Sequence, residues 1–145
     1  MDSCIFCKII AGEAPGSIVY EDERALALMD VNPVTVGHTL VIPRQHYAFL
    51  ADMDEPTGMH LFKIAQRMAA ALRESGVRCE GVNLFLADGE AALQDVFHVH
   101  LHVIPRYKGD SFQVAADWDI KPSRAELDRV AGQIRAAYRR LQGDD

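Results

Sequence analysis

The spacing of apolar residues along the chain predicts five strands and two helices. Short apolar or alternating runs, bounded by glycine, proline or acidic residues, predict strands over residues 17–20, 25–29, 38–42, 81–87 and 97–104. Apolar residues at helical spacing predict a long helix over residues 54–75 and a second helix that begins at residue 123. Asp54 is the expected N-cap of the first helix. Ser123 and Glu126 form a capping-box sequence at the start of the second helix.

The order of these elements predicts an α+β fold. Strands that are mostly adjacent in the sequence favour a mainly antiparallel five-stranded sheet, with the two helices against one face. The long helix falls in the connection between the third and fourth strands. The chain has 145 residues and shows no internal repeat, low-complexity segment or linker. We therefore expect residues 1–145 to form a single domain.

Composition and charge narrow the function classes. The formal net charge is -6, which argues against a nucleic-acid partner but leaves a single nucleotide open as substrate. The sequence contains no apolar run near the ~20 residues that span a membrane. It also lacks a basic segment followed by an apolar stretch at its start, so we expect a cytoplasmic protein. In a reducing compartment its three cysteines are not expected to form disulfides.

Three histidines alternate with apolar residues in the fifth predicted strand. Because side chains alternate between the faces of a strand, His98, His100 and His102 are expected on one side at intervals of ~6.6 Å. Histidine exchanges protons near neutral pH and can act as a nucleophile. Three imidazoles along one straight strand span too far to ligate one small cation, so one or two at most would be metal ligands.

The segment that holds these histidines resembles the signature of the histidine triad family. In that signature, His-x-His-x-His is followed by two apolar residues, as in residues 98–104 here. Further similarities follow the family's order and spacing. They comprise the opening strand region at residues 4–9, the acidic turn at 29–33, the central segment at 37–43 with His46, and the loop at 94–96.

This resemblance implies a nucleotidyl hydrolase or transferase. The family acts on adenosine phosphoramidates, dinucleoside polyphosphates and similar conjugates, so the expected substrate is a purine nucleotide such as an AMP conjugate. Carried over by position, His100 is the nucleophile that forms a nucleotidyl-histidine intermediate on the α-phosphate. His102 would contact the phosphate and help to protonate the leaving group, and His98 completes the catalytic triad.

The resemblance also implies a nucleotide-binding set. Asp30 matches the residue that binds the ribose hydroxyls, while Gln94 and Asp95 match the loop that binds phosphate. The base would be walled by apolar residues at three positions, Phe6, Leu28 and Val31. His38 would orient the backbone or His100 through a hydrogen bond, or would be a satisfied half-buried histidine.

Two positions depart from the family pattern. Ala87 stands where many members have an asparagine near the phosphate, and Leu93 stands where a glycine usually precedes the glutamine. Both changes remove polar or close-approach contacts. After the triad, Arg106 and Lys108 could meet a polyphosphate tail or could be plain surface charges.

The pair Cys4-x-x-Cys7 has a spacing that one metal ion can bridge, although two inert thiols would have the same spacing. The resemblance implies that Cys4, Cys7, His46 and His98 bind a structural zinc ion. It also implies a homodimer in which two five-stranded sheets join into a continuous sheet. Two other functions stay open: a nucleotide-binding or scaffold protein with weak catalysis, and a metal-sensing module.

Overall fold

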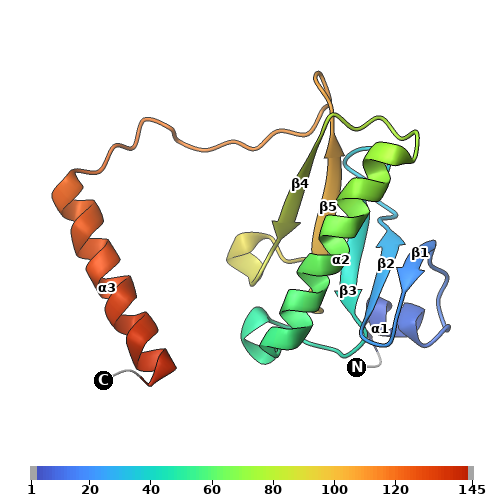
Figure 1. The fold of residues 1–145 in the computed structure, drawn as a ribbon, viewed down its shortest axis with the longest axis horizontal. Coiled ribbons are helices and arrows are strands. Elements are labelled where there is room, and N and C mark those ends of the chain that lie inside the picture. The colour runs from blue at the N-terminus through green and yellow to red at the C-terminus, as the bar shows by residue number, and fades with distance from the viewer. Residues whose placement is uncertain (1–2, 144–145) are drawn as a thin grey trace. The chain divides into compact units, whose positions relative to one another are not determined.

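The described part of the chain, residues 3–143 of the computed structural model, contains one antiparallel sheet in the order β1-β2-β3-β5-β4 (Figure 1). The ends of the predicted single domain, residues 1 and 145, lie outside this part. The predicted α+β class and five-stranded sheet are confirmed. The strands are β1 (Ile18–Glu21), β2 (Ala25–Met29), β3 (Thr39–Pro43), β4 (Gly81–Leu86) and β5 (Leu101–Arg106).

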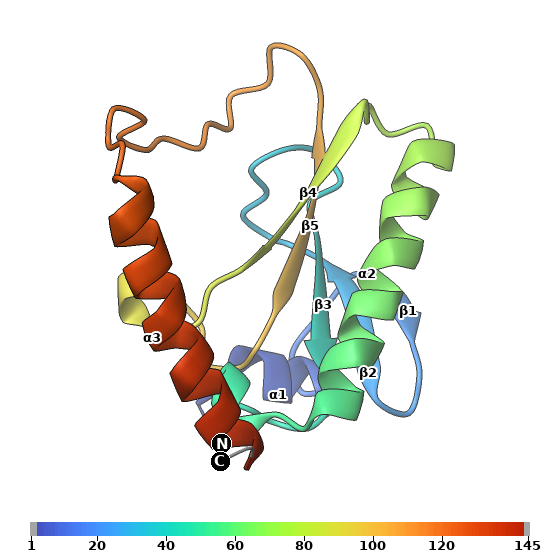
Figure 2. The ribbon, with the colours of Figure 1, turned by 60° about the vertical axis from the view of Figure 1, so that its left-hand side comes forward.

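The long helix α2 (Glu55–Glu74) connects β3 to β4, as predicted, and covers one face of the sheet (Figure 2). The Asp54 carboxylate caps it by accepting a hydrogen bond from the Thr57 backbone N–H at 2.9 Å. The apolar positions at helical spacing are buried against the sheet, and each fully buried leucine or isoleucine contributes about 1.5–3 kcal/mol. This core contains Leu61, Ile64, Ala65 and Leu72 of α2 together with Ala25, Ala27, Val41, Val99, Leu101 and Val103.

The segment that resembles the opening strand region of the family is a short helix in this chain, α1 (Ile5–Ile10). Its backbone bonds are local, as in the bond from the Lys8 N–H to the Cys4 carbonyl at 3.1 Å. Phe6, Ile9 and Ile10 recur at helical spacing, and a strand would have split them between two faces. They pack on the sheet face opposite α2, where Figure 2 shows α1. The expectation that helices cover only one face was therefore wrong for this end of the chain.

The fifth strand begins later and ends later than predicted. Residues 97–100 lie outside β5 because their hydrogen bonds go elsewhere: the Val99 N–H donates to the Tyr47 carbonyl at 2.7 Å and the His98 N–H to the Val96 carbonyl at 2.9 Å. Pro105 does not end the strand. Pairing with β3 stops at Val103, so β5 has a partner only on its β4 side when it reaches Pro105, which an edge position tolerates.

Two short 3-10 helices, η1 (Leu50–Asp52) and η2 (Glu90–Ala92), lie in the connections that follow β3 and β4. A second compact unit begins at Gln113 and contains α3 (Arg124–Gln142). The predicted capping box is present at its start, since the Glu126 N–H donates to the Ser123 hydroxyl and the Ser123 N–H donates to the Glu126 carboxylate. None of the described helices is long and apolar enough to cross a membrane.

Candidate active site and metal site

A cavity of about 310 Å³ lies on the sheet face opposite α2. One wall is α1, and the opposite wall is formed by the end of β2 and the turn after it. His100 and His102 lie in it beside the loop that precedes them. Seven of the lining residues are Phe6, Leu28, Asp30, Val31, Asp95, His100 and His102, which the resemblance had assigned to nucleotide binding or catalysis.

The ring of His100 is buried, with only 2% of the residue exposed, and is held by its own chain. Its Nδ1 lies 2.8 Å from the carbonyl oxygen of His98, which can only accept a hydrogen bond. The proton of the neutral ring therefore sits on Nδ1, and Nε2 keeps a free lone pair. That nitrogen lies 3.4 Å from an Asp95 carboxylate oxygen at the cavity. In its neutral form, His100 thus presents an unprotonated imidazole nitrogen, which is the atom that a nucleophile requires.

His38 determines which nitrogen of the His102 ring carries the proton. The Val34 backbone N–H donates to His38 Nδ1 at 3.2 Å, so the proton of His38 must lie on Nε2. That N–H faces His102 Nδ1 at 2.8 Å, which leaves the proton of His102 on Nε2. Burial, with the nearby rings of His100 and His38, lowers the pKa of His102 to about 4. Burial also lowers the pKa of His38, against the opposing effect of Asp30.

The rings of His38 and His102 are therefore both neutral at physiological pH. Of the roles expected for His38, the hydrogen bond to the backbone is present, from the Val34 N–H, whereas its other nitrogen bonds to His102 and not to His100. Asp30 has one carboxylate oxygen 3.5 Å from His38 Nε2, and its other oxygen accepts the Asn32 N–H at 2.8 Å.

Asp30, His38 and His102 also place three ligand-type atoms within 4.8 Å of one another. A metal ion bound to His38 Nε2 would require the proton of that ring to sit on Nδ1. The Val34 N–H already points at Nδ1, so two hydrogens would face each other. This cluster is consequently a hydrogen-bonded chain and does not fit a metal ion.

A second cluster lies beyond the cavity and brings together the four predicted metal ligands, Cys4, Cys7, His46 and His98. His98 Nδ1 is 3.5 Å from the Cys4 sulfur and 3.6 Å from the Cys7 sulfur. The Cys7 sulfur is 3.3 Å from His46 Nδ1. A tetrahedral zinc ion with its usual bonds separates its ligand atoms by about 3.3–3.8 Å, so these residues fit one.

The hydrogen bond on the far side of His98 supports the same conclusion. Its Nε2–H donates to the Pro43 carbonyl at 2.9 Å, which leaves Nδ1 unprotonated toward the two sulfurs. Metal-bound histidines usually have their second nitrogen held in this way. His98 does not line the cavity with the other two histidines of the triad; its ring belongs to the Cys/His cluster, and its carbonyl holds His100.

The loop before the triad holds Gln94 in the interior rather than at the cavity. The Gln94 amide donates to the carbonyls of Ala48 and Val96, and its oxygen accepts the Gly89 N–H at 2.7 Å. Gln94 is absent from the described residues that line the cavity, so it shapes the loop that carries Asp95. Leu93 adopts φ 68°, a left-handed conformation that costs a leucine energy but suits the glycine of the family pattern. Ala87, the other position that departs from the family pattern, is buried, with 3% of the residue exposed.

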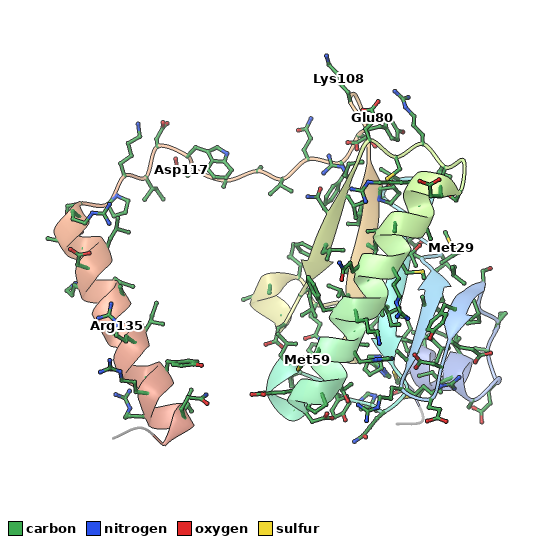
Figure 3. The ribbon with its side chains drawn as sticks, in the orientation of Figure 1. Met29, Met59, Glu80, Lys108, Asp117 and Arg135 are labelled. Atoms are coloured by element: carbon green, nitrogen blue, oxygen red, sulfur yellow. The ribbon has the colours of Figure 1, made fainter. Side chains whose placement is uncertain are left out.

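The two basic residues after the triad lie at the other end of β5. The Arg106 guanidinium donates to both carboxylate oxygens of Asp110 and to the Asn83 side chain. Figure 3 shows Lys108 beside Glu80 at the far tip of the sheet, and the Lys108 N–H donates to the Glu80 carboxylate. Neither basic side chain lines the cavity, so the surface-charge interpretation fits them better than contact with a polyphosphate tail.

Sequence reasoning missed the backbone groups that set the proton positions, namely the Val34 N–H and the carbonyls of Pro43 and His98. No side-chain pattern reports them. It also missed Ile5 and Ile9, which line the cavity from α1. The apolar spacing of residues 5–10 was the available signal for these two.

Comparison with known proteins gives consistent matches. The family model described as HIT domain matches residues 11–109, a span that contains all six histidines. An uncharacterized HIT-like protein of Borreliella burgdorferi is 47% identical over 113 residues, which cover 77% of this chain and 81% of that protein. The adenylylsulfatase HINT3 of Arabidopsis thaliana is 34% identical over 140 residues, covering 96% of this chain and 69% of that protein. The crystal structure of a zinc-bound histidine triad family protein from Mycobacterium smegmatis is 43% identical, with a TM-score of 0.75 and 99% of each chain covered.

Proposed function

This chain belongs to the histidine triad family, and on that premise we propose that it is a nucleotidyl hydrolase or transferase whose nucleophile is His100. The substrate is a purine nucleotide conjugate, such as an AMP conjugate, attacked at its α-phosphate. The observation that carries the proposal is the bond from His100 Nδ1–H to the His98 carbonyl, which leaves Nε2 of the neutral ring unprotonated beside the cavity. Family members are nucleotide hydrolases, and the name of the Arabidopsis relative, adenylylsulfatase, is of this kind.

The reaction has two displacement steps at phosphorus. His100 Nε2 forms a bond to phosphorus while the bond from phosphorus to the leaving group breaks. The leaving group departs with that electron pair and takes a proton from solvent when it is basic. Water then attacks phosphorus, the phosphorus–nitrogen bond breaks, and the nucleoside monophosphate leaves while the proton of the water passes to solvent. Splitting the reaction in this way replaces one difficult step with two easier ones.

The groups around His100 would stabilise the charges of this reaction or hold the parts of the substrate. The ring of His100 becomes positive in the intermediate, and the His98 carbonyl on Nδ1–H stabilises that charge. His102 offers an Nε2–H to a phosphoryl oxygen or to the leaving atom, because His38 occupies its other nitrogen. The apolar wall of Phe6, Leu28 and Val31 would hold the base, and Asp30 would accept hydrogen bonds from the ribose.

Intact-mass measurement after brief incubation with an AMP phosphoramidate tests this function. We expect a fraction of the protein to carry one nucleotidyl group, and His100→Asn to carry none. Bound nucleotide without any covalent adduct, together with no turnover, would support the alternative of a nucleotide-binding or scaffold protein. That alternative leaves the proton arrangement of His38 and His102 without a purpose.

We also infer that Cys4, Cys7, His46 and His98 hold a structural zinc ion. The ligand-atom distances, the bond from His98 to Pro43 and the zinc-bound relative support this. When bound, the ion would link α1 to the segment before β5. Elemental analysis of protein purified without chelator should find one zinc per chain, and its absence would contradict the assignment.

We further propose a homodimer in which two sheets join through β4. This strand lies at the sheet edge, and its Leu84 and Phe85 side chains are substantially exposed. An unpaired edge with apolar side chains favours pairing with another chain. Sedimentation that shows only monomer at micromolar concentration would contradict the proposal.

A further inference from the structure

The cavity is lined by charge of one sign. Asp30 and Asp95 are its charged side chains, and no lysine or arginine is among the described residues that line it. A neighbouring hollow of about 400 Å³ shares Ile5, Asp95 and Val96 with the cavity. Its remaining described lining residues also include no lysine or arginine.

Asp95 stands at the boundary between these two hollows. Its side chain is 80% exposed, and one oxygen lies 3.4 Å from His100 Nε2. The same oxygen accepts the Val96 N–H at 2.9 Å, which keeps the carboxylate at this position. In an in-line displacement the leaving atom lies about 5 Å from the attacking nitrogen, and so within about 8 Å of this carboxylate.

No lysine or arginine among the described residues that line the two hollows offsets that carboxylate. Arg106 is held by Asp110 and Asn83 at the other end of β5, and Lys108 lies at the strand tip (Figure 3). A zinc ion in the Cys/His cluster would add no net charge, because two cysteine thiolates balance the charge of the ion. A leaving group with several negative charges would therefore meet this carboxylate and no lysine or arginine among the described residues that line the two hollows.

We propose that Asp95 selects substrates by the charge of the leaving group, favouring nucleotide conjugates of neutral or cationic amines over dinucleoside polyphosphates. This rests on the proposed function. The α-phosphate carries one negative charge in both substrate classes, so its repulsion by Asp95 cancels from the comparison. The additional charges of the leaving group do not cancel.

Simple electrostatics sets the size of the effect. At a separation of about 8 Å, one unit of charge changes the rate about two-fold in water and about thirty-fold at an effective dielectric constant of about 20; the exposure of Asp95 places the effect toward the lower end of this range. Because Asp95 is exposed, salt screens this interaction, and the selectivity should fade at an ionic strength near 1 M, where the screening length is about 3 Å.

The test uses AMP phosphoramidates of three short amines that differ in their far end. The amines are 1,3-diaminopropane with a free ammonium, 3-aminopropanol with a neutral hydroxyl, and β-alanine with a carboxylate. All three substrates carry a phosphorus–nitrogen bond to a primary alkylamine, and comparison of the parent with Asp95→Asn cancels the differences in amine basicity that the far group causes. We expect kcat/KM to fall in that order by about two- to ten-fold per unit of charge, with diadenosine tetraphosphate turned over more slowly than the neutral amide.

Asp95→Asn should bring the three values together, and their ratio is the readout whatever the effect of the variant on the absolute rate. Glu90→Gln is the matched control, since it removes one negative charge from the same loop at an exposed position outside the cavity lining, and it should preserve the order. An equal kcat/KM for all three substrates, an order unchanged in Asp95→Asn, or an equal collapse in Glu90→Gln would overturn the inference. Failure of every substrate to form a nucleotidyl adduct would refute the proposed function instead.

Discussion

The Nε2–H of His38 donates a hydrogen bond to Nδ1 of His102 across 2.8 Å, and this bond determines which nitrogen of His102 faces the cavity as a donor. The direction of the bond is set one residue further back, by the Val34 backbone N–H on His38 Nδ1. A main-chain amide thus sets the position of the proton on a side chain at the proposed reaction centre.

Replacing His38 should therefore slow the chemical step while substrate still binds. In His38→Phe the His102 ring is free to carry its proton on Nδ1, which takes the donor away from the cavity. We expect the single-turnover rate of nucleotidylation to fall about 10- to 100-fold, the range typical of one lost proton or hydrogen-bond contact. Nitrogen NMR of the His102 ring should show the mixed tautomers directly.

His60 offers a matched control for that experiment. It bonds to Asp22 at 2.7 Å and does not line the cavity, so His60→Gln should leave the rate near that of the parent. A His38→Phe rate equal to the parent rate would refute a role for the hydrogen-bonded chain.

Replacing the nucleophile should have the larger effect. His100→Asn keeps a side chain of similar size and should still bind nucleotide, but turnover should fall by several orders of magnitude. His102→Asn should slow the reaction and still allow covalent capture. Mass detection in single-turnover experiments separates the two variants, and an adduct that accumulates on His100→Asn would refute the mechanism.

Loss of one predicted metal ligand should lower stability. Cys7→Ser should reduce zinc content and the Tm together, because the free energy of metal binding adds to that of folding. Cys79→Ser is the control, since Cys79 bonds only to the Gly81 carbonyl among its described partners and lies outside the Cys/His cluster. Equal zinc content in Cys7→Ser and the parent would exclude this ligand set.

A glycine at position 93 should stabilise the protein. Leu93 sits at φ 68° and is 80% exposed, so it bears the cost of a left-handed backbone and buries little apolar surface. After allowing for the greater flexibility of glycine in the unfolded chain, Leu93→Gly should add about 0.5–1 kcal/mol to the free energy of unfolding. Leu93→Ala keeps the strain and should change little; urea denaturation measures both, and a destabilised Leu93→Gly would contradict the argument.

Acid should destabilise the fold through His102. Its pKa is lowered to about 4 in the folded protein from an ordinary value of 6.5. Between these two values the unfolded chain binds more protons, so the free energy of unfolding should fall as the pH drops from about 6.5 to 4. His102→Asn should have a shallower dependence over this window in urea denaturation at several pH values. An identical dependence in both proteins would argue against the buried neutral ring.

The spacing of apolar residues correctly predicted the helices and strands whose backbone hydrogen bonds follow the regular helix or sheet pattern. The apolar positions of α2 and the alternation of Val99, Leu101 and Val103 with the histidines both hold in the structure. The prediction was wrong where backbone carbonyls outside the sheet take over the hydrogen bonds of the strand. Residues 97–100 look like strand, but Tyr47 and Val96 supply their hydrogen-bond acceptors, so the ladder begins only at Leu101.

The residues of the cavity could be named from the sequence, but their protonation could not. The resemblance to the family named seven residues that line the cavity. Nothing in the sequence, however, distinguishes the ring of His98, which donates to a carbonyl, from that of His38, which accepts from an amide. That difference decides which histidine can bind a metal ion, and it depends on the three-dimensional position of Pro43 and Val34.

The helix α1 has six residues and carries two kinds of contact at once: Cys7 lies in the Cys/His cluster, while Phe6 lines the cavity and touches the rings of His98 and His100. A helix this short is not stable in isolation, so what holds either of its sides orders the other. Thermodynamic reciprocity then requires that a metal ion which tightens nucleotide binding be itself bound more tightly when nucleotide is present, by the same factor. On the proposed assignments, zinc bound to the Cys/His cluster would help to order α1, and the share of protein with an ordered apolar wall would rise with the free concentration of zinc.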